Sequence, residues 1–172
     1  MIRAAVLDEL DVLITAHRLH DHPLHPVPID RAIEKYPIRY VAQLPGNLMA
    51  LIVRWKRGEQ DHVGIMFNAI LQNPDQSARR RHAAAHELAH DLCDHKGSLL
   101  YMQGTSEDLS RCGSVLGQRQ EQECEYVAAY LLVPMLALFE AEGETIESAA
   151  ASLDVPPHLV ALRLNIWHRH TR

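Results

Sequence analysis

The chain has 172 residues, of which 47% are hydrophobic and 23% are charged, and its formal net charge is -5 at pH 7. These values are ordinary for one soluble globular domain with a real core, and the net negative charge argues against general affinity for nucleic acid. Three cysteines without framework spacing suggest a reducing compartment. The start, MIRAAVLDELD, lacks the apolar region of a signal peptide, and no apolar run approaches membrane-spanning length, so we expect a cytoplasmic protein.

The first part of the chain predicts two helices followed by a small sheet. Apolar residues at helical spacing favour helices over residues 6–19 and 28–36. The strands are expected over residues 38–42, 48–55 and 62–67, which are rich in β-branched and aromatic residues. We therefore expect an α+β fold with a three-stranded, mostly antiparallel sheet. The edge of such a sheet could accept an extended peptide as a further strand.

The most informative stretch is a predicted helix over residues 77–95, which contains the HEXXH sequence His86-Glu87-Leu88-Ala89-His90. At about 100° per residue, His86 and His90 lie about 40° apart on one face, where two imidazoles can bind one zinc ion. Glu87 lies about 60° round from His90 and could act as a general base on water. The alternative interpretation is an alanine-rich core helix with exposed histidines.

Two neighbours complicate the proposed metal face. His82 lies one turn before His86, and Cys93 lies three residues after His90. Either could be a ligand, but we favour His82 as a pocket-edge residue and Cys93 as a small buried apolar residue. Lys96 occupies the position where some HEXXH proteins carry a third histidine, so the third protein ligand must come from elsewhere.

A segment of about twenty residues, 96–117, follows the metal helix and has no strong period. Loops this long in a compact domain tend to be functional or disordered, and this one could form a wall of a substrate cleft. Tyr101 could offer its hydroxyl to a tetrahedral intermediate. An ordinary packing role for Tyr101 is the plainer interpretation. Before the metal helix, Asp75 or Ser77 is expected to cap its first turn.

A second decisive helix is predicted over residues 118–133 and ends at Pro134. It carries three glutamates, one of which would complete a His-His-Glu zinc site. Helical periodicity places Glu125 on the polar side and leaves Glu121 and Glu123 open, since both border the apolar face. For any one of the three, the alternative is a solvated helix surface.

Together, the HEXXH sequence preceded by Ala85 and the downstream stretch ECEYVAAYLLVP (residues 123–134) resemble the ImmA/IrrE family of zinc metallopeptidases. Asn68 and His95 also fit that family's pattern, and the resemblance covers about residues 38–164. It implies a mainly helical, zincin-like metallopeptidase domain over residues 1–134. It also implies that the metal ligands are His86, His90 and Glu123 and that the catalytic residue is Glu87. The choice of Glu123 over Glu121 rests on the resemblance alone.

The chain departs from the family pattern at four positions, none of which removes a ligand. Cys124 stands for the usual Ala, Glu125 for Asn or Asp, and Val127 for Phe, while His82 replaces an apolar residue. Glu125 changes the hydrogen bonds around the ligands, where small changes can cost much of the metal affinity.

The C-terminal segment, residues 135–172, predicts further helices over 135–141, 145–153 and 158–167, packed on the same domain. The last two, joined by the turn at residues 154–157, have a helix-turn-helix shape. The end of the chain is locally basic, which would suit contact with DNA. Direct DNA binding is the less favoured interpretation, because the chain is acidic overall and the last helix carries few basic side chains.

Two classes of function follow. The first, implied by the resemblance, is a zinc-dependent endopeptidase that acts selectively on a partner protein. That partner would be a helix-turn-helix transcriptional repressor, and its cleavage would switch on stress-response or mobile-element genes. The second is a non-cleaving, metal-stabilised regulatory protein that binds a repressor or DNA, with a toxin–antitoxin component as a weaker variant. No membrane partner is expected.

Overall fold

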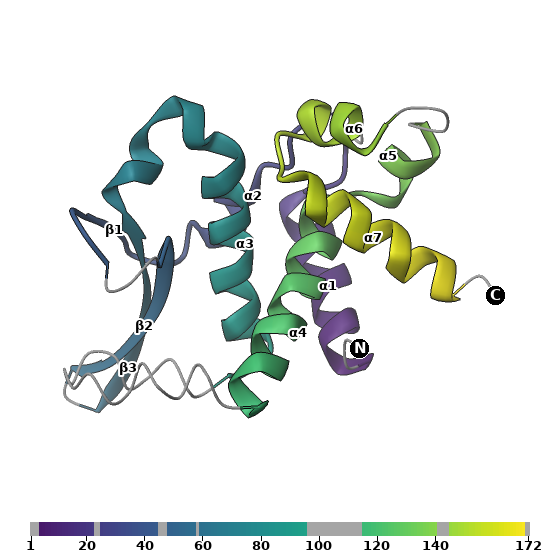
Figure 1. Cartoon of the computed structure of the whole chain (residues 1–172). Coiled ribbons are helices and arrows are strands. Elements are labelled where there is room, and N and C mark those ends of the chain that lie inside the picture. The colour runs from purple at the N-terminus through teal and green to yellow at the C-terminus, as the bar shows by residue number, and fades with distance from the viewer. Residues whose placement is uncertain are drawn as a thin grey trace.

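The computed structural model of the protein describes residues 4–22, 25–44, 48–57, 59–95, 115–140 and 145–170. The elements are α1 (Ala4–His17), α2 (Ile29–Ile33), β1 (Ile38–Val41), β2 (Ala50–Arg57), β3 (Gln60–Asn68), two 3-10 turns (Ala69–Gln72 and Pro74–Gln76), α3 (Ser77–Leu92), α4 (Val115–Leu132), α5 (Met135–Glu140), α6 (Ile146–Leu153) and α7 (Pro157–His170). The sheet lies on one side of α3, and α4 with the C-terminal helices lies on the other (Figure 1). This arrangement confirms the predicted α+β class. Tyr101 and most of the expected loop fall outside the described residues, and α4 begins at Val115, inside that loop's expected end.

The sheet is mixed: its longer pairing is antiparallel, as expected, and its shorter pairing is parallel. Its strand order is β1-β3-β2, with β3 antiparallel to β2 but parallel to β1. The short connection between β2 and β3 makes those two strands neighbours, and β3 then lies between β2 and β1. As a result β2 is an edge strand, pairing only with β3 among the described strands.

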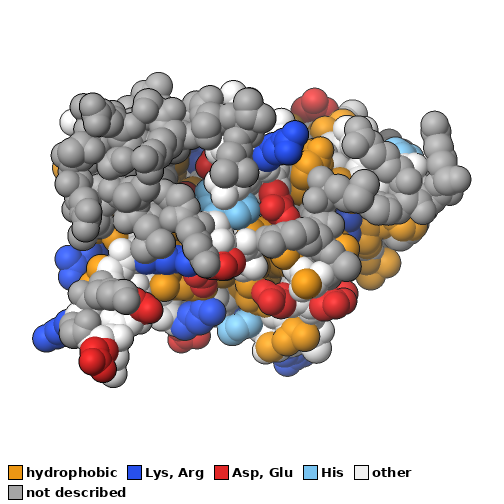
Figure 2. All heavy atoms as spheres, turned by 90° about the horizontal axis from the view of Figure 1, so that it is seen from below, with side chains coloured by type: hydrophobic (Ala, Val, Ile, Leu, Met, Phe, Trp, Pro, Cys, Tyr) orange, Lys and Arg blue, Asp and Glu red, His pale blue; other side chains and the backbone are white. Residues whose placement is uncertain are grey.

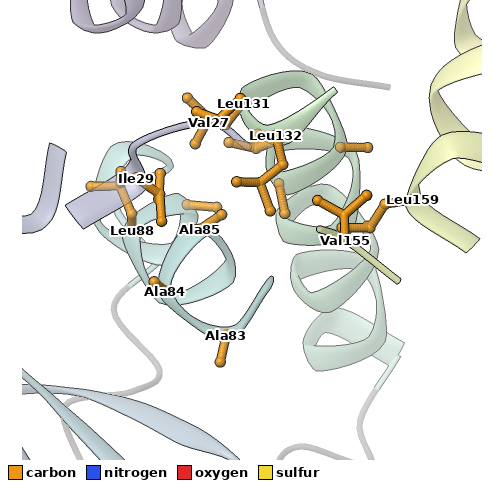
Figure 3. Packing of buried hydrophobic residues seen from close by; sticks show 14 of the residues in the cluster. Val27, Ile29, Ala83, Ala84, Ala85, Leu88, Leu131, Leu132, Val155 and Leu159 are labelled. Carbon is orange, nitrogen blue, oxygen red and sulfur yellow. The ribbon is translucent and has the colours of Figure 1, made fainter. Parts of the chain in front are cut away.

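The core is built around the apolar side of α3. Ala84, Ala85, Leu88 and Ala89 are fully buried, and the small alanines let neighbouring elements approach closely. In Figure 3 the side chains of this part of α3 face Val27 and Ile29 on one side and the end of α4 on the other. Burying a side chain the size of Leu88 contributes about 1.5–3 kcal/mol. The apolar side is thereby fixed, which leaves the histidine side of α3 to face α4.

The C-terminal helices pack on this same core. The turn between α6 and α7 contains Asp154 in a left-handed conformation (φ 50°). Its carboxylate accepts hydrogen bonds from Ser77 Oγ at 2.8 Å and Arg81 Nε at 3.0 Å, both on α3. On α7, the buried Arg163 lies 4.3 Å from the ring centroid of Tyr130 on α4. These contacts suit a segment packed on the main domain, while the division at residue 134 stays a prediction.

No helix in the described part of the chain is long and apolar enough to cross a membrane.

Candidate metal centre

Helix α3 carries its histidines on the side that faces α4. The rings of His86 and His90 are 5.1 Å apart between centroids, and their side chains are 16% and 11% exposed. One helical turn separates them, and the alanine side of the same helix is buried behind them. Figure 2 shows histidine and acidic side chains next to each other near the middle of the face seen from below. The HEXXH sequence therefore does place two partly accessible imidazoles side by side.

The start of α3 differs from the expected capping. Its N-cap is Gln76, whose side chain makes no capping hydrogen bond. Asn73 instead accepts from the backbone N–H of Asp75 and caps the preceding 3-10 turn. Ser77 donates to Asp154 rather than to its own helix. The 3-10 turn leads directly into α3, so the first turn of α3 does not depend on a side-chain cap.

Glu121 of α4 reaches both histidines of the HEXXH motif. Its Oε2 lies 3.0 Å from His86 Nε2, and its Oε1 lies 3.5 Å from His90 Nε2. Burial raises the pKa of Glu121, but the hydrogen bond from His86 and the charges of the nearby histidines together outweigh burial and lower the pKa, so the carboxylate stays charged. Two imidazoles and one carboxylate are a donor set that zinc prefers in catalytic sites. These three residues therefore fit a zinc ion.

Glu123, the third ligand implied by the resemblance, contacts a different histidine. Its Oε2 lies 3.2 Å from His95 Nε2, and His95 Nδ1 lies 3.2 Å from His90 Nδ1. His95 reaches this position because α3 ends in a turn with Asp94 at φ 51° and a hydrogen bond from His95 N–H to the His90 carbonyl. The structure thus brings Glu121, and not Glu123, to the pair of HEXXH histidines. Glu123 as a ligand stays a prediction that this arrangement does not favour.

Glu125 packs against α3 and is partly buried, which corrects the expectation that it lies on a solvated polar side. Its Oε1 lies 3.0 Å from both His82 Nε2 and His86 Nδ1. Burial would raise the pKa of Glu125, but the bonds to His82 and His86 outweigh it and hold the pKa well below its usual range. Helical periodicity gave the wrong surroundings for Glu125 because a polar face of a helix was assumed to face solvent. Here the polar face of α4 packs on the histidines of α3.

His86 lies between the two carboxylates of Glu121 and Glu125. Carboxylates only accept hydrogen bonds, so both ring nitrogens of His86 carry a hydrogen in this arrangement. Burial opposes the positive charge, but the two hydrogen bonds outweigh it and raise the pKa of His86 to about 10. Metal ligands must be deprotonated, so a metal ion must displace a proton from this ring. The Nδ1–H bond to Glu125 would then still orient the ring.

Glu87 is held in place by the sheet. It is 8% exposed, and its Oε2 accepts a hydrogen bond from the backbone N–H of Ile52 at 2.6 Å. Ile52 lies in the edge strand β2, and this N–H points away from β3 toward α3. Burial raises the pKa of Glu87 to about 7, with the charge of His86 opposing the shift. A carboxylate with such a pKa is suited to accept a proton near neutral pH.

Cys93 and Cys124, the two cysteines in the described residues, are buried and form no disulfide there. Cys124 Sγ lies 3.4 Å from His95 Nδ1, and each cysteine belongs to a group of side chains that could together hold a metal. Burial raises the pKa of Cys124, and a metal ligand must be a thiolate. The sulfur of Cys124 also lies close enough to His86 and His90 for the three to hold a metal, so Cys124 lines the site, while Cys93 is buried as we expect of a small apolar residue.

One network around the site gave no local signal in the sequence. Asp91, next to His90, accepts hydrogen bonds from Tyr36 Oη and from Arg54 NH2, each at 2.6 Å. Tyr36 follows α2 and Arg54 lies in β2, so the network ties the end of α3 to both elements. The partners are 55 and 37 residues away in the chain, which is why no spacing pattern could indicate them.

Residues 53–165 match the sequence model of a peptidase family, Peptidase M78, described as the IrrE N-terminal-like domain. The chain belongs to this family. The match covers more than half of the chain, including α3 and α4, and it confirms the resemblance seen in the sequence. No curated protein and no solved structure gives a significant match. Membership in this family indicates a metallopeptidase.

Proposed function

We propose that the protein is a zinc-dependent endopeptidase whose metal is held by His86, His90 and Glu121. The observation that carries this proposal is the Glu121 carboxylate, which lies 3.0 and 3.5 Å from the two HEXXH imidazoles. A bound zinc ion would supply Lewis acidity, polarising the scissile carbonyl and making water easier to deprotonate. Family membership supports peptide hydrolysis as the reaction.

Glu87 would move the proton. The hydrogen bond from Ile52 engages Oε2 and fixes the carboxylate in one orientation. We expect Oε1 to take the proton from the attacking water and then to give it to the amine of the departing peptide. The burial that raises the pKa of Glu87 helps both transfers, because neither the charged nor the neutral form is strongly favoured near neutral pH.

Strand β2 is the element that would align the substrate. It is an edge strand, and at Ile52 its outward backbone already reaches the catalytic carboxylate. An extended peptide added along this edge would therefore pass Glu87. Arg54 would keep its hydrogen bond to Asp91, which holds β2 against α3 while a peptide binds.

The substrate would be one partner protein rather than peptides in general. We propose a helix-turn-helix transcriptional repressor, whose cleavage would switch on stress-response or mobile-element genes. The family resemblance supports this choice, and the site would act in the cytoplasm, in keeping with Cys93 and Cys124, which form no disulfide among the described residues.

The experiment compares new protein N-termini in cells that express the intact protein, Glu87→Gln or Glu59→Gln. Glu59 is exposed in the connection between β2 and β3 and serves as a matched control. We expect a few cuts, including one in a repressor, with the intact protein and Glu59→Gln but not with Glu87→Gln. Equal sets of N-termini from all three, with each protein folded and zinc-loaded, would contradict the peptidase proposal.

The alternative is a regulatory protein that binds a repressor without cutting it. Its distinguishing result is a repressor that co-purifies intact with both the unaltered protein and Glu87→Gln. Direct DNA binding is less favoured, because Arg163 of α7 is 5% exposed and stacks on Tyr130. A side chain buried in this way is not available to a phosphate.

A further inference from the structure

A second group of metal-binding side chains lies one helical turn from the first, at the junction of three helices. His82 comes from α3, Glu125 from α4 and His158 from the first turn of α7. His82 Nε2 lies 3.0 and 3.1 Å from the two Glu125 oxygens, and His158 Nε2 lies 3.4 Å from Glu125 Oε2. The rings of His82 and His158 are 5.1 Å apart between centroids. Two imidazoles from different helices thus converge on one carboxylate.

The arrangement is held by contacts that do not involve these three residues. Four residues before His158, Asp154 is bound by Ser77 and Arg81 of α3. Arg81 also donates to the backbone carbonyl of Val27. These bonds fix the start of α7 against the first turns of α3, where His82 lies. The ligand atoms are therefore brought together by the fold, which lowers the entropic cost of binding a metal there.

We propose that His82, Glu125 and His158 form a second site for a divalent transition-metal ion, with zinc as the natural candidate. Its donor set, two imidazoles and a carboxylate, matches that of the HEXXH site. It is more open, since the His158 side chain is 57% exposed and those of Glu125 and His82 are 31% and 22% exposed. We therefore expect weaker and readily exchangeable binding.

The two sites share a residue, so their occupancies are linked. Glu125 Oε1 contacts both His82 and His86 Nδ1. A metal ion bound to the Glu125 carboxylate weakens the hydrogen bond between Glu125 and His86. That hydrogen bond orients the His86 ring, whose other nitrogen faces Glu121. Binding at the second site should therefore lower the affinity of the first, and thermodynamic reciprocity requires the reverse effect to be equal. Loss of such an outer hydrogen bond typically costs 10–100-fold in metal affinity, which sets about the size of the coupling.

The test is zinc titration of the metal-free full chain by calorimetry, with ZnCl2 as the probe and a chelator used beforehand to remove bound metal. We expect two zinc ions per chain, one tight and one weaker. His158→Ala should weaken only the second event, by at least about 10-fold, as should His82→Ala. His22→Ala, which removes an exposed histidine outside both groups, should leave both events unchanged.

Several outcomes separate this proposal from the peptidase proposal. A second event that persists unchanged in His158→Ala and His82→Ala, or a single event lost only on His90→Ala, would overturn the second site. A single event that is lost on His158→Ala but kept on His90→Ala would support the second site and contradict the first. Because His158 is exposed, its replacement should not disturb folding, and circular dichroism of each variant checks this.

Discussion

The two halves of α4 make different kinds of contact, although they form one helix. In the first half, alternate glutamates each contact a histidine supplied by α3 or by the turn after it: Glu121, Glu123 and Glu125. In the second half every residue from Val127 to Leu132 except Tyr130 is fully buried and apolar or alanine. The first half therefore meets α3 through charges, and the second half meets the core through packing.

This difference shows what burying charges beside a helix requires. A carboxylate moved fully out of water without a partner costs roughly several kcal/mol, so a glutamate that is partly buried is expected to meet a donor. The side chains of Glu121, Glu125 and Glu123 are 47%, 31% and 18% exposed. The histidines of α3 supply those donors at one-turn spacing, and α4 can then run alongside. In the metal-free protein, the site's own residues thus satisfy one another, and a metal ion must compete with these bonds.

The largest expected effect comes from removing Glu121, the carboxylate that reaches both HEXXH histidines. Glu121→Ala should lower zinc affinity by more than about 100-fold, since even outer hydrogen-bonding partners cost 10–100-fold. Glu123→Ala should cost less, because the Glu123 carboxylate contacts His95, which in turn contacts His90. Chelator competition on the purified variants measures both. Retention of tight zinc by Glu121→Ala together with its loss from Glu123→Ala would restore the ligand implied by the resemblance.

A substitution in the apolar second half of α4 should lower the stability of the protein and not its metal affinity. Leu131 is fully buried, so Leu131→Ala should lower the free energy of unfolding by about 2–5 kcal/mol. Leu136→Ala in α5, where the side chain is 53% exposed, is the matched control and should change it by less than about 0.5 kcal/mol. Denaturant unfolding of the metal-free proteins measures both. Equal losses in the two variants would contradict the division of α4 into a charged and a packing half.

A structural feature can be predicted from the sequence when the residues that determine it are close together in the chain. The helices and the shared face of His86 and His90 follow from residues three or four apart, and the structure has them. The pairing of β1 with β3 does not, because it depends on which strand occupies the free edge after β2 and β3 have joined.

The same limit applies within the candidate site. Glu121 and Glu125 are four residues apart and therefore share one face of α4, but periodicity could not say that the face meets histidines. His158 is 76 residues from His82, and only the fold brings them to one carboxylate. Choosing the third ligand needed the packing of α4 on α3, which no spacing within either helix contains.

Pro134 ends α4, and two side chains then bind carbonyls near its last turn. Arg163 Nε donates to the carbonyl of Val133 at 3.3 Å and is 5% exposed. Arg163→Met keeps much of the side-chain volume but leaves this carbonyl without the donor, so it should cost about 1–3 kcal/mol of stability. Arg163→Lys, which retains a charged donor, should cost less. Unfolding free energies of the three proteins test this, and an unchanged Arg163→Met would show that the bond contributes nothing.

The smallest effect concerns the other capping side chain, His20, whose Nε2 lies 2.8 Å from the carbonyl oxygen of Leu131. A carbonyl only accepts, so Nε2 carries the hydrogen and the ring can stay neutral. Burial lowers the pKa of His20, and the charge of Arg163 adds to that shift while the bond to Leu131 opposes it. The unfolded chain therefore binds a proton on this ring at higher pH than the folded protein does.

That difference gives the sign of a pH effect. As pH falls below about 6.5, the unfolded state gains a proton first, and the folded protein loses stability relative to a variant without the ring. Between pH 6.5 and 5.5 the advantage of the unaltered protein over His20→Gln should shrink, by at most about 1 kcal/mol, which is the limit for a folded-state ring that takes up no proton in this range. Denaturant unfolding of both metal-free proteins at pH 7.5, 6.5 and 5.5 measures this advantage, and the other histidines cancel in the comparison. A gap that stays constant with pH would mean that His20 titrates alike in both states and caps α4 without any cost in proton binding.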